Sequence, residues 1–170
     1  MRRTGAIVVI SALALAGLTG CSAAVEGIAG VRVDADGQLV GILDWCPGKP
    51  GADTIVLYKG GDGGVTDEVV ELDRPAGPDT RTAEDVVLLA PAGGWQTRRA
   101  PAALDDDQLY DLRAWNSNDA AVDDFPFRIG ELRGRAGRDT ILTKQWDGKR
   151  YVATFHTPED FATYADSRCD

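Results

Sequence analysis

The stretch Leu104-Asp105-Asp106-Asp107-Gln108-Leu109-Tyr110-Asp111-Leu112 carries the clearest information about the fold. Three consecutive aspartates favour a turn, and the run from Gln108 to Trp115 that follows them predicts a β-strand. The apolar side chains of this run fall on both faces of the strand, with Tyr110 and Leu112 on one face and Leu109 on the other. The prediction of a mainly β fold starts from this strand.

The same nine residues resemble the corner between strands E and F of fibronectin type III and related immunoglobulin-like domains. In those domains a leucine lies six residues before a tyrosine, and the tyrosine hydroxyl forms a hydrogen bond with the backbone of the corner. Leu104 and Tyr110 have this spacing, and Leu112 is the apolar residue two positions after the tyrosine. Asp105 to Asp107 replace the proline and glycine that are usual at this corner. The resemblance implies an immunoglobulin-like sandwich.

Further short strands are expected on both sides of this corner. The runs that predict them are residues 31–34, 38–45, 54–58, 65–73, 85–90, 127–132, 140–146 and 149–156. Asp36-Gly37 and Asp147-Gly148 each separate two such runs and predict β-hairpins. Together these patterns predict a mainly β domain built as an antiparallel β-sandwich, with the immunoglobulin-like form favoured and another sandwich or a small barrel as the alternative.

The last segment of the chain predicts a short α-helix. Thr157 suits the N-cap position and Pro158 the first helical position. Phe161, Ala165 and Cys169 follow at intervals of four residues, so they lie on one stripe of the helix. We expect this stripe to face the body of the domain, where it presents Cys169.

The N-terminus resembles the leader of bacterial lipoproteins. Arg2 and Arg3 precede an apolar run, residues 6–18, and Leu18-Thr19-Gly20-Cys21 has the order of a lipobox. A helix of about thirteen residues spans roughly 20 Å and is too short to cross a bilayer core of about 30 Å. The resemblance implies that residues 1–20 are a signal peptide and that Cys21 receives a diacylglycerol and becomes the new N-terminus. Ordinary secretion, with cleavage near Ala23-Ala24, is the alternative.

These features divide the chain into three parts. Residues 1–20 form the signal peptide, residues 21–29 the lipidated cysteine and a short tether, and residues 30–170 a single β-rich extracytoplasmic domain. The expected location is the outer face of the cell membrane, where the lipid holds the protein.

Two cysteines remain after Cys21. An even pair in an exported chain predicts a disulfide between Cys46 and Cys169. Neither cysteine matches the inter-sheet pair of antibody domains. A metal site or a redox pair would need further histidines or a Cys-x-x-Cys motif, which the sequence lacks. We therefore expect no metal and no cofactor.

The charge of the chain limits its partners. The net charge is −9, and it becomes −11 when Arg2 and Arg3 leave with the signal peptide. Such a surface repels phosphate backbones, so nucleic acid is not expected as a partner. Few lysines and many Ala, Gly, Asp and Arg residues resemble proteins of high-GC Gram-positive bacteria.

Catalytic chemistry has little support in the sequence. His156 is the single histidine, and no serine lies in a Gly-x-Ser-x-Gly motif. Trp95, in a Gly-Gly-Trp loop, is the tryptophan most expected to be exposed and could stack on a ligand. An oxygen-rich segment, which could bind Ca²⁺ or form a solvated loop, contains Asn116, Asn118, Asp119, Asp123 and Asp124.

The sequence therefore predicts a lipid-anchored extracytoplasmic domain that binds a partner or supports the envelope without catalysis. Its partners would be the membrane, through the lipid anchor, and an envelope protein or cell-wall component. The alternatives are a cell-envelope hydrolase with a carboxylate site and a Ca²⁺-dependent ligand-binding or sensor domain. The sequence indicates no oligomeric state.

Overall fold

The structure is a computed structural model, and it describes residues 24–61, 64–75, 83–99, 104–118, 120–123, 125–136 and 139–169. Within these ranges eleven strands form one sheet and two helices accompany it. In chain order the elements are β1 (Ala24–Val33), β2 (Leu39–Trp45), β3 (Thr54–Gly61), β4 (Gly64–Asp73), β5 (Ala83–Val87), β6 (Gln96–Arg99), β7 (Leu109–Trp115), β8 (Ala120–Asp123), β9 (Phe125–Arg128), α1 (Ile129–Arg133), β10 (Ile141–Trp146), β11 (Tyr151–His156) and α2 (Pro158–Asp166).

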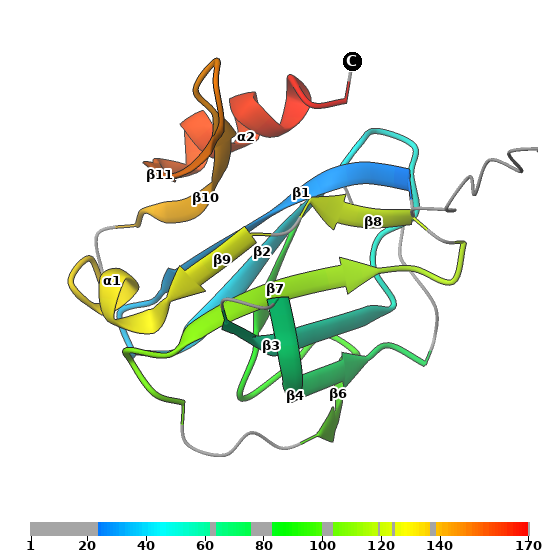
Figure 1. Cartoon of the computed structure of the whole chain (residues 1–170). Helices are drawn as coiled ribbons and strands as arrows, with labels where there is room; N and C mark the ends of the chain where they lie inside the picture. Colours follow the sequence, from blue (N-terminus) through cyan, green and yellow to red (C-terminus); the bar gives the residue numbers. More distant parts are fainter. Residues whose placement is uncertain are drawn as a thin grey trace, which may run out of the picture.

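The first strand lies at the centre of the sheet (Figure 1). β1 pairs antiparallel with β2 from Gly27 to Val33 and with β10 at Val31, while its first residues pair parallel with β8. The long path through the sheet runs β11-β10-β1-β8-β7-β3-β4-β6, and β2 and β9 branch from β1 and β7. The sheet is therefore mixed in direction, because a single parallel pair joins its two halves.

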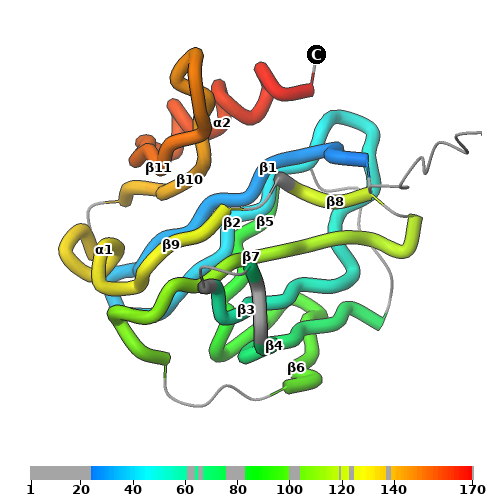
Figure 2. The backbone as a smooth tube through the Cα atoms, viewed as in Figure 1, coloured from blue at the N-terminus to red at the C-terminus, as the bar shows by residue number. Residues whose placement is uncertain are grey.

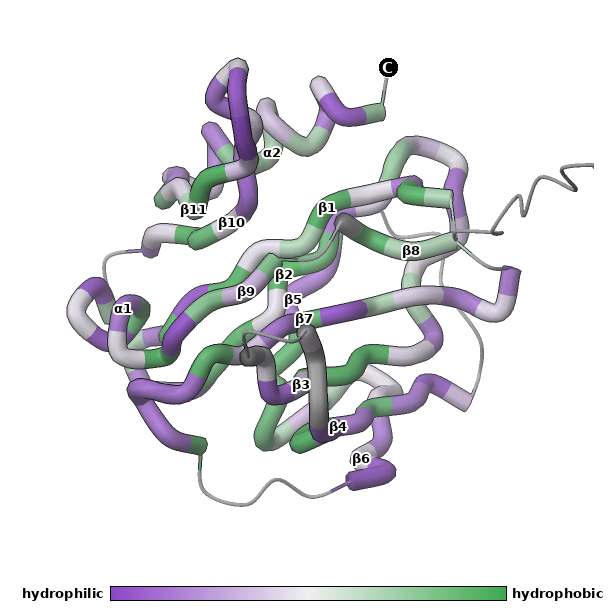
Figure 3. Tube along the Cα trace, in the orientation of Figure 1, coloured by the Kyte–Doolittle hydropathy of each residue, from purple (hydrophilic) through white to green (hydrophobic). Residues whose placement is uncertain are grey.

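The sheet curls into a half-barrel around the main core. Buried side chains from both halves of the sheet meet there, and the largest of them include Tyr110, Phe127, Leu43 and Leu57. Hydrophobic segments accordingly lie along parts of β1 and β2, β7 alternates between hydrophobic and hydrophilic residues, and the turn between β10 and β11 is hydrophilic (Figure 3). The expectation of a mainly β domain with a short C-terminal helix is confirmed.

The corner predicted before β7 is present. The backbone N–H of Asp105 donates a hydrogen bond to the hydroxyl oxygen of Tyr110 at 2.9 Å, and Tyr110 is buried. The Asp105 carboxylate accepts a hydrogen bond from the backbone N–H of Asp107, also at 2.9 Å. The aspartates thus shape the turn through their own side chains, which replaces the usual proline and glycine.

A second layer covers the outer face of β1 and β2. The segment from β10 to α2 returns over β1 at the end of the chain (Figure 2). Phe161 and Ala165 of α2 are buried against this face, in a small cluster with Ile28, Val40, Ile42 and Ile141. Thr157 caps the helix by accepting a hydrogen bond from the backbone N–H of Asp160, as the sequence predicts.

The disulfide closes this second layer. Cys46 and Cys169 are bonded, with their Cα atoms 5.3 Å apart and a separation of 123 positions in sequence. The predicted pairing is therefore present, and it ties the end of α2 to the end of β2.

Two sequence predictions need correction, and two short strands were missed. Residues 24–29, expected in the tether, are the first part of β1, because Ile28 and Ala29 are buried in the two apolar clusters. A strand was expected over residues 127–132, but β9 ends at Arg128 and α1 follows. Ile129 and Leu132 are three residues apart, so they lie on the same face of this helix, and both are buried in the core. The short strands β6 and β8 were missed, since each has only four residues, β6 contains no apolar residue and β8 shows no alternation of apolar and polar residues.

Candidate functional site

Trp95 lies in the interior instead of on the surface. Its side chain is 5% exposed, its indole Nε1 donates a hydrogen bond to the Glu84 carboxylate at 3.1 Å, and the Arg74 guanidinium covers its ring at 4.3 Å from the centroid. Arg74, itself buried, also forms an ion pair with Glu84. The expectation that Trp95 offers a stacking platform is wrong, because the ring is used to build a buried polar cluster.

The oxygen-rich segment is only partly visible, since Asp119 and Asp124 lie outside the described residues. Asn116 is buried, and its amide oxygen accepts hydrogen bonds from the backbone N–H groups of Asn118 and Ala120 at 2.9 and 3.3 Å. Asn118 belongs to this turn, and Asp123 to β8. Among the described residues no group of three or more acidic, histidine or cysteine side chains is placed to hold a metal ion.

His156 lines an open hollow of about 360 Å³ together with Gln145, Asp160, Thr163, Tyr164 and Ser167. Its ring stacks on that of Tyr164, with centroids 5.5 Å apart, and burial lowers its pKa although Asp160 acts in the opposite direction. Ser167 Oγ donates to the Tyr164 carbonyl at 2.7 Å, and the Asp160 carboxylate accepts from the Thr157 hydroxyl at 2.8 Å. The groups that a Ser-His-Asp relay would use therefore serve the ends of the helix.

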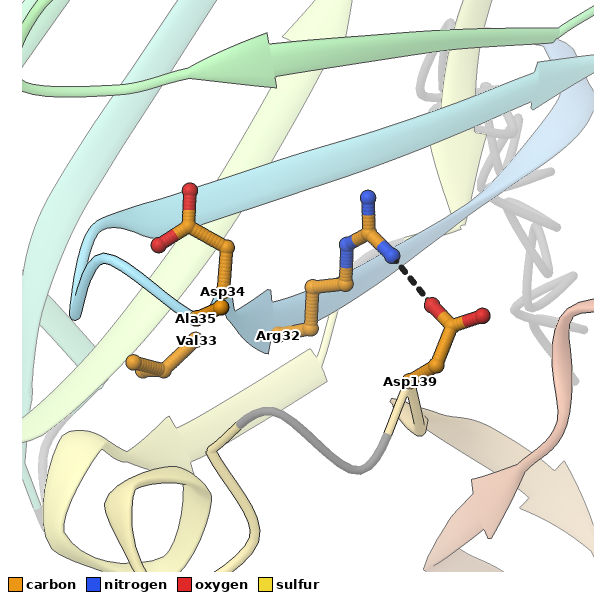
Figure 4. Close-up of a pocket in the computed structure, with 5 residues that line it drawn as sticks. All are labelled: Arg32, Val33, Asp34, Ala35 and Asp139. Carbon is orange, nitrogen blue, oxygen red and sulfur yellow. Dashed lines mark hydrogen bonds and ion pairs between the residues drawn. The ribbon is translucent and has the colours of Figure 1, made fainter.

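A small hollow of about 220 Å³ lies beside Arg32 (Figure 4). The two terminal nitrogens of Arg32 donate to the carboxylates of Asp139 and Asp85, at 2.5 and 2.6 Å. Since two carboxylates already face the guanidinium, the hollow has no excess positive charge that would attract an anion. Arg32 instead ties β1 to β5 and to the segment before β10.

A larger hollow of about 510 Å³ lies at the disulfide and is lined by Cys46, Pro47, Lys49, Asp166, Ser167 and Cys169. Asp44, two residues before Cys46, faces the same end of α2. The pKa of the Asp44 carboxyl is raised to about 6, mainly because the group is buried and to a smaller extent because Asp166 is negatively charged. The C-terminal end of the helix also disfavours negative charge. This pair of carboxylates is the feature of the structure that comes nearest to a hydrolase site.

We predict that Asp44→Asn stabilises the protein at neutral pH. A carboxyl whose folded pKa lies above its ordinary value binds its proton more tightly when folded, so its ionisation opposes folding. The penalty is absent below pH 3.8, grows as the pH rises and is complete above about pH 6. Because Asp44 is only half buried, we expect a gain of about 1–2 kcal/mol at pH 7.5. Urea unfolding at pH 7.5 and pH 3.5 measures it; an equal gain at both pH values would contradict this account.

The most exposed large aromatic side chains lie on the hairpin between β10 and β11, which we call the aromatic hairpin (residues 144–151). Trp146 and Tyr151 are 50% and 45% exposed, face each other across the hairpin, and have ring centroids 5.2 Å apart. Lys144 Nζ lies 4.8 Å from the Tyr151 ring centroid. Sequence reasoning missed this pair, although Trp and Tyr directly beside an Asp-Gly turn give a detectable signal.

The turn of the aromatic hairpin is organised by Asp147. Its carboxylate accepts hydrogen bonds from the backbone N–H groups of Lys149 and Arg150 at 2.8 and 2.9 Å. These two hydrogen bonds lower the pKa of Asp147, and the bond from Arg150 has the larger effect. Both basic side chains are exposed. The hairpin thus combines two aromatic rings, three cations and one carboxylate on a defined turn.

Comparisons of the chain with protein-family models, with curated proteins and with solved structures found no match. Neither helix in the described part of the chain has the length and hydrophobicity needed to cross a bilayer.

Proposed function

We propose that this protein is a lipoprotein held on the outer face of a membrane through Cys21, and that its domain acts by binding, without catalysis. The observation that carries the proposal is the Cys46–Cys169 disulfide in a chain with a lipobox. A disulfide persists in oxidising compartments outside the cytosol, where a lipoprotein leader would deliver the domain.

The side chains around the candidate sites support binding over catalysis. Near His156, Ser167 and Asp160 are engaged in hydrogen bonds at the ends of α2, and near Arg32 two carboxylates occupy the guanidinium. In contrast, the aromatic hairpin exposes groups that have no role in the core. Exposed aromatic and basic side chains on a rigid turn are typical of recognition surfaces.

A carboxylate hydrolase is the second candidate. The specific observation in its favour is the raised pKa of Asp44 beside Asp166, since a general acid needs a carboxyl that keeps its proton near neutral pH. Asp166 lines the hollow at the disulfide, and Asp44 lies beneath the helix end instead of lining this hollow. For this reason we favour the binding function.

We predict that Cys21→Ser releases the protein from the membrane. The serine cannot form the thioether, so the variant loses the two acyl chains, each of which contributes about 0.8 kcal/mol per buried CH₂. In detergent phase separation, the wild-type chain enters the detergent phase and the variant the aqueous phase. Ser22→Ala, which keeps the Leu-Thr-Gly-Cys sequence, is the matched control and stays in the detergent phase. A Cys21→Ser chain that still partitions with the detergent would overturn the proposed anchor.

A further inference from the structure

The aromatic hairpin and the start of β1 point toward the same end of the sheet. β10 is antiparallel to β1, and Leu142 lies opposite Val31. From Leu142 to Trp146, β10 therefore runs in the direction from Val31 back to Ala24. The disulfide marks the same end, because the backbone N–H of Cys46 donates to the Glu26 carbonyl at 2.9 Å. The Tyr164 hydroxyl donates to the Lys144 carbonyl at 2.9 Å and fixes the hairpin on α2.

Only a few residues separate the start of β1 from the proposed lipid. Cys21 precedes Ala24, the first residue of β1, by three positions, which reach at most about 11 Å when fully extended. A lipid on Cys21 would therefore hold the end of the sheet that carries the aromatic hairpin close to the bilayer. The short connection follows from the correction that residues 24–29 belong to β1.

The chemistry of the hairpin suits the bilayer interface. Trp and Tyr favour the headgroup level of a membrane, where their rings meet apolar matter and their polar groups stay hydrated. Lys144, Lys149 and Arg150 add three positive charges and Asp147 one negative charge, in a protein whose mature net charge is −11. An anionic surface would attract this hairpin and repel the rest of the domain, which favours a single orientation.

We propose that the aromatic hairpin docks onto an anionic lipid surface and orients the domain on the membrane. The proposal rests on the proposed lipid anchor, which supplies the nearness of the bilayer. The lipid then gives the affinity, and Trp146, Tyr151, Lys149 and Arg150 give the orientation. Docked in this way, the domain directs the opposite end of the sheet, where β1 ends and β2 begins, away from the membrane.

The test uses the full lipidated chain in vesicles of phosphatidylglycerol and phosphatidylcholine in which part of the lipid is brominated. Bromine quenches only tryptophans that reach the acyl boundary. Trp45 and Trp95 are 3% and 5% exposed and Trp115 is partly buried, whereas Trp146 is 50% exposed. We expect quenching of the wild type that disappears in Trp146→Phe. The mass of the protein is measured first, to show that the lipid is present. If quenching is then unchanged in Trp146→Phe, or is absent from both proteins, the docking is overturned and the anchor stays intact.

A second measurement separates docking from anchoring. The unlipidated Cys21→Ser chain is titrated with the same vesicles at low salt, where each cation removed should weaken partitioning about fivefold. We expect this loss for Lys149→Ala and for Arg150→Ala, but not for Leu89→Ser. Leu89 is a matched control because it is 44% exposed and follows Leu88, which pairs with Leu39 at the far end of the sheet. Equal binding of all four chains overturns the docking, whatever the mass shows for Cys21.

Discussion

Replacing both Cys46 and Cys169 by alanine lowers the free energy of unfolding by about 4–5 kcal/mol in the chain-entropy description of disulfides. The effect is large because the bond spans 123 residues, so its loss frees most of the unfolded domain. The native state also loses the covalent tie between α2 and β2. The remaining contacts of α2 come from Phe161 and Ala165, which are buried, and from Tyr164, which is partly buried against the same cluster.

Urea unfolding of the double variant, followed by circular dichroism, measures this loss. Hydrogen exchange shows its location, and we expect the amides of α2 to lose protection before those of β7. The wild type treated with a reductant under native conditions is the control for the two alanine side chains and should show the same midpoint. A double variant as stable as the oxidised wild type would mean that the packing of α2 alone holds the second layer.

Glu84→Ala destabilises the fold by about 3–5 kcal/mol, because it leaves a buried positive charge without its main counter-ion. Arg74 is 7% exposed and stacks on the buried ring of Trp95, so its guanidinium has little access to water. The same substitution removes the acceptor of the Trp95 indole N–H. Both losses occur within one cluster that links β5 to the loop before β6.

The matched control separates the charge from the hydrogen bond. Glu84→Gln keeps an acceptor for Trp95 and removes only the negative charge, so we expect it to lose most of the stability that Glu84→Ala loses. Adding Arg74→Met to Glu84→Gln should restore most of this stability, because the unpaired charge is then gone. Thermal unfolding of the three variants decides the point. Equal stability of Glu84→Gln and the wild type would show that the ion pair contributes little.

The parts of the fold that the sequence predicts are those with local physical causes. The corner at Tyr110 depends on spacing within nine residues, the start of α2 on Thr157 and Pro158, and the two hairpins on Asp-Gly turns. The disulfide follows from counting cysteines in a chain whose leader predicts export. Each of these features is decided by residues close together in sequence or by the small number of candidates.

The missed features depend on contacts between distant segments. The first residues of β1 pair with β8, nearly a hundred positions away, and nothing in Ala24 to Ala29 distinguishes such a strand from a flexible tether. Trp95 is buried because Arg74, directly after β4, and Glu84, on β5, approach it, which a Gly-Gly-Trp loop does not reveal. The aromatic hairpin was predicted as a hairpin, but the exposure of Trp146 depends on where α2 leaves the sheet uncovered.

The central position of β1 has a consequence for how the chain folds. This strand precedes the other described strands in the chain, and β2, which follows directly, can cover one of its edges early. Its other partners, β8 and β10, lie about a hundred residues further on, so part of its hydrogen-bonding capacity stays open until they have been synthesised. Contacts of such long sequence separation slow folding, and an unpaired strand edge invites aggregation while it waits. Attachment to a surface directly beside that strand would keep nascent copies apart during the slow step.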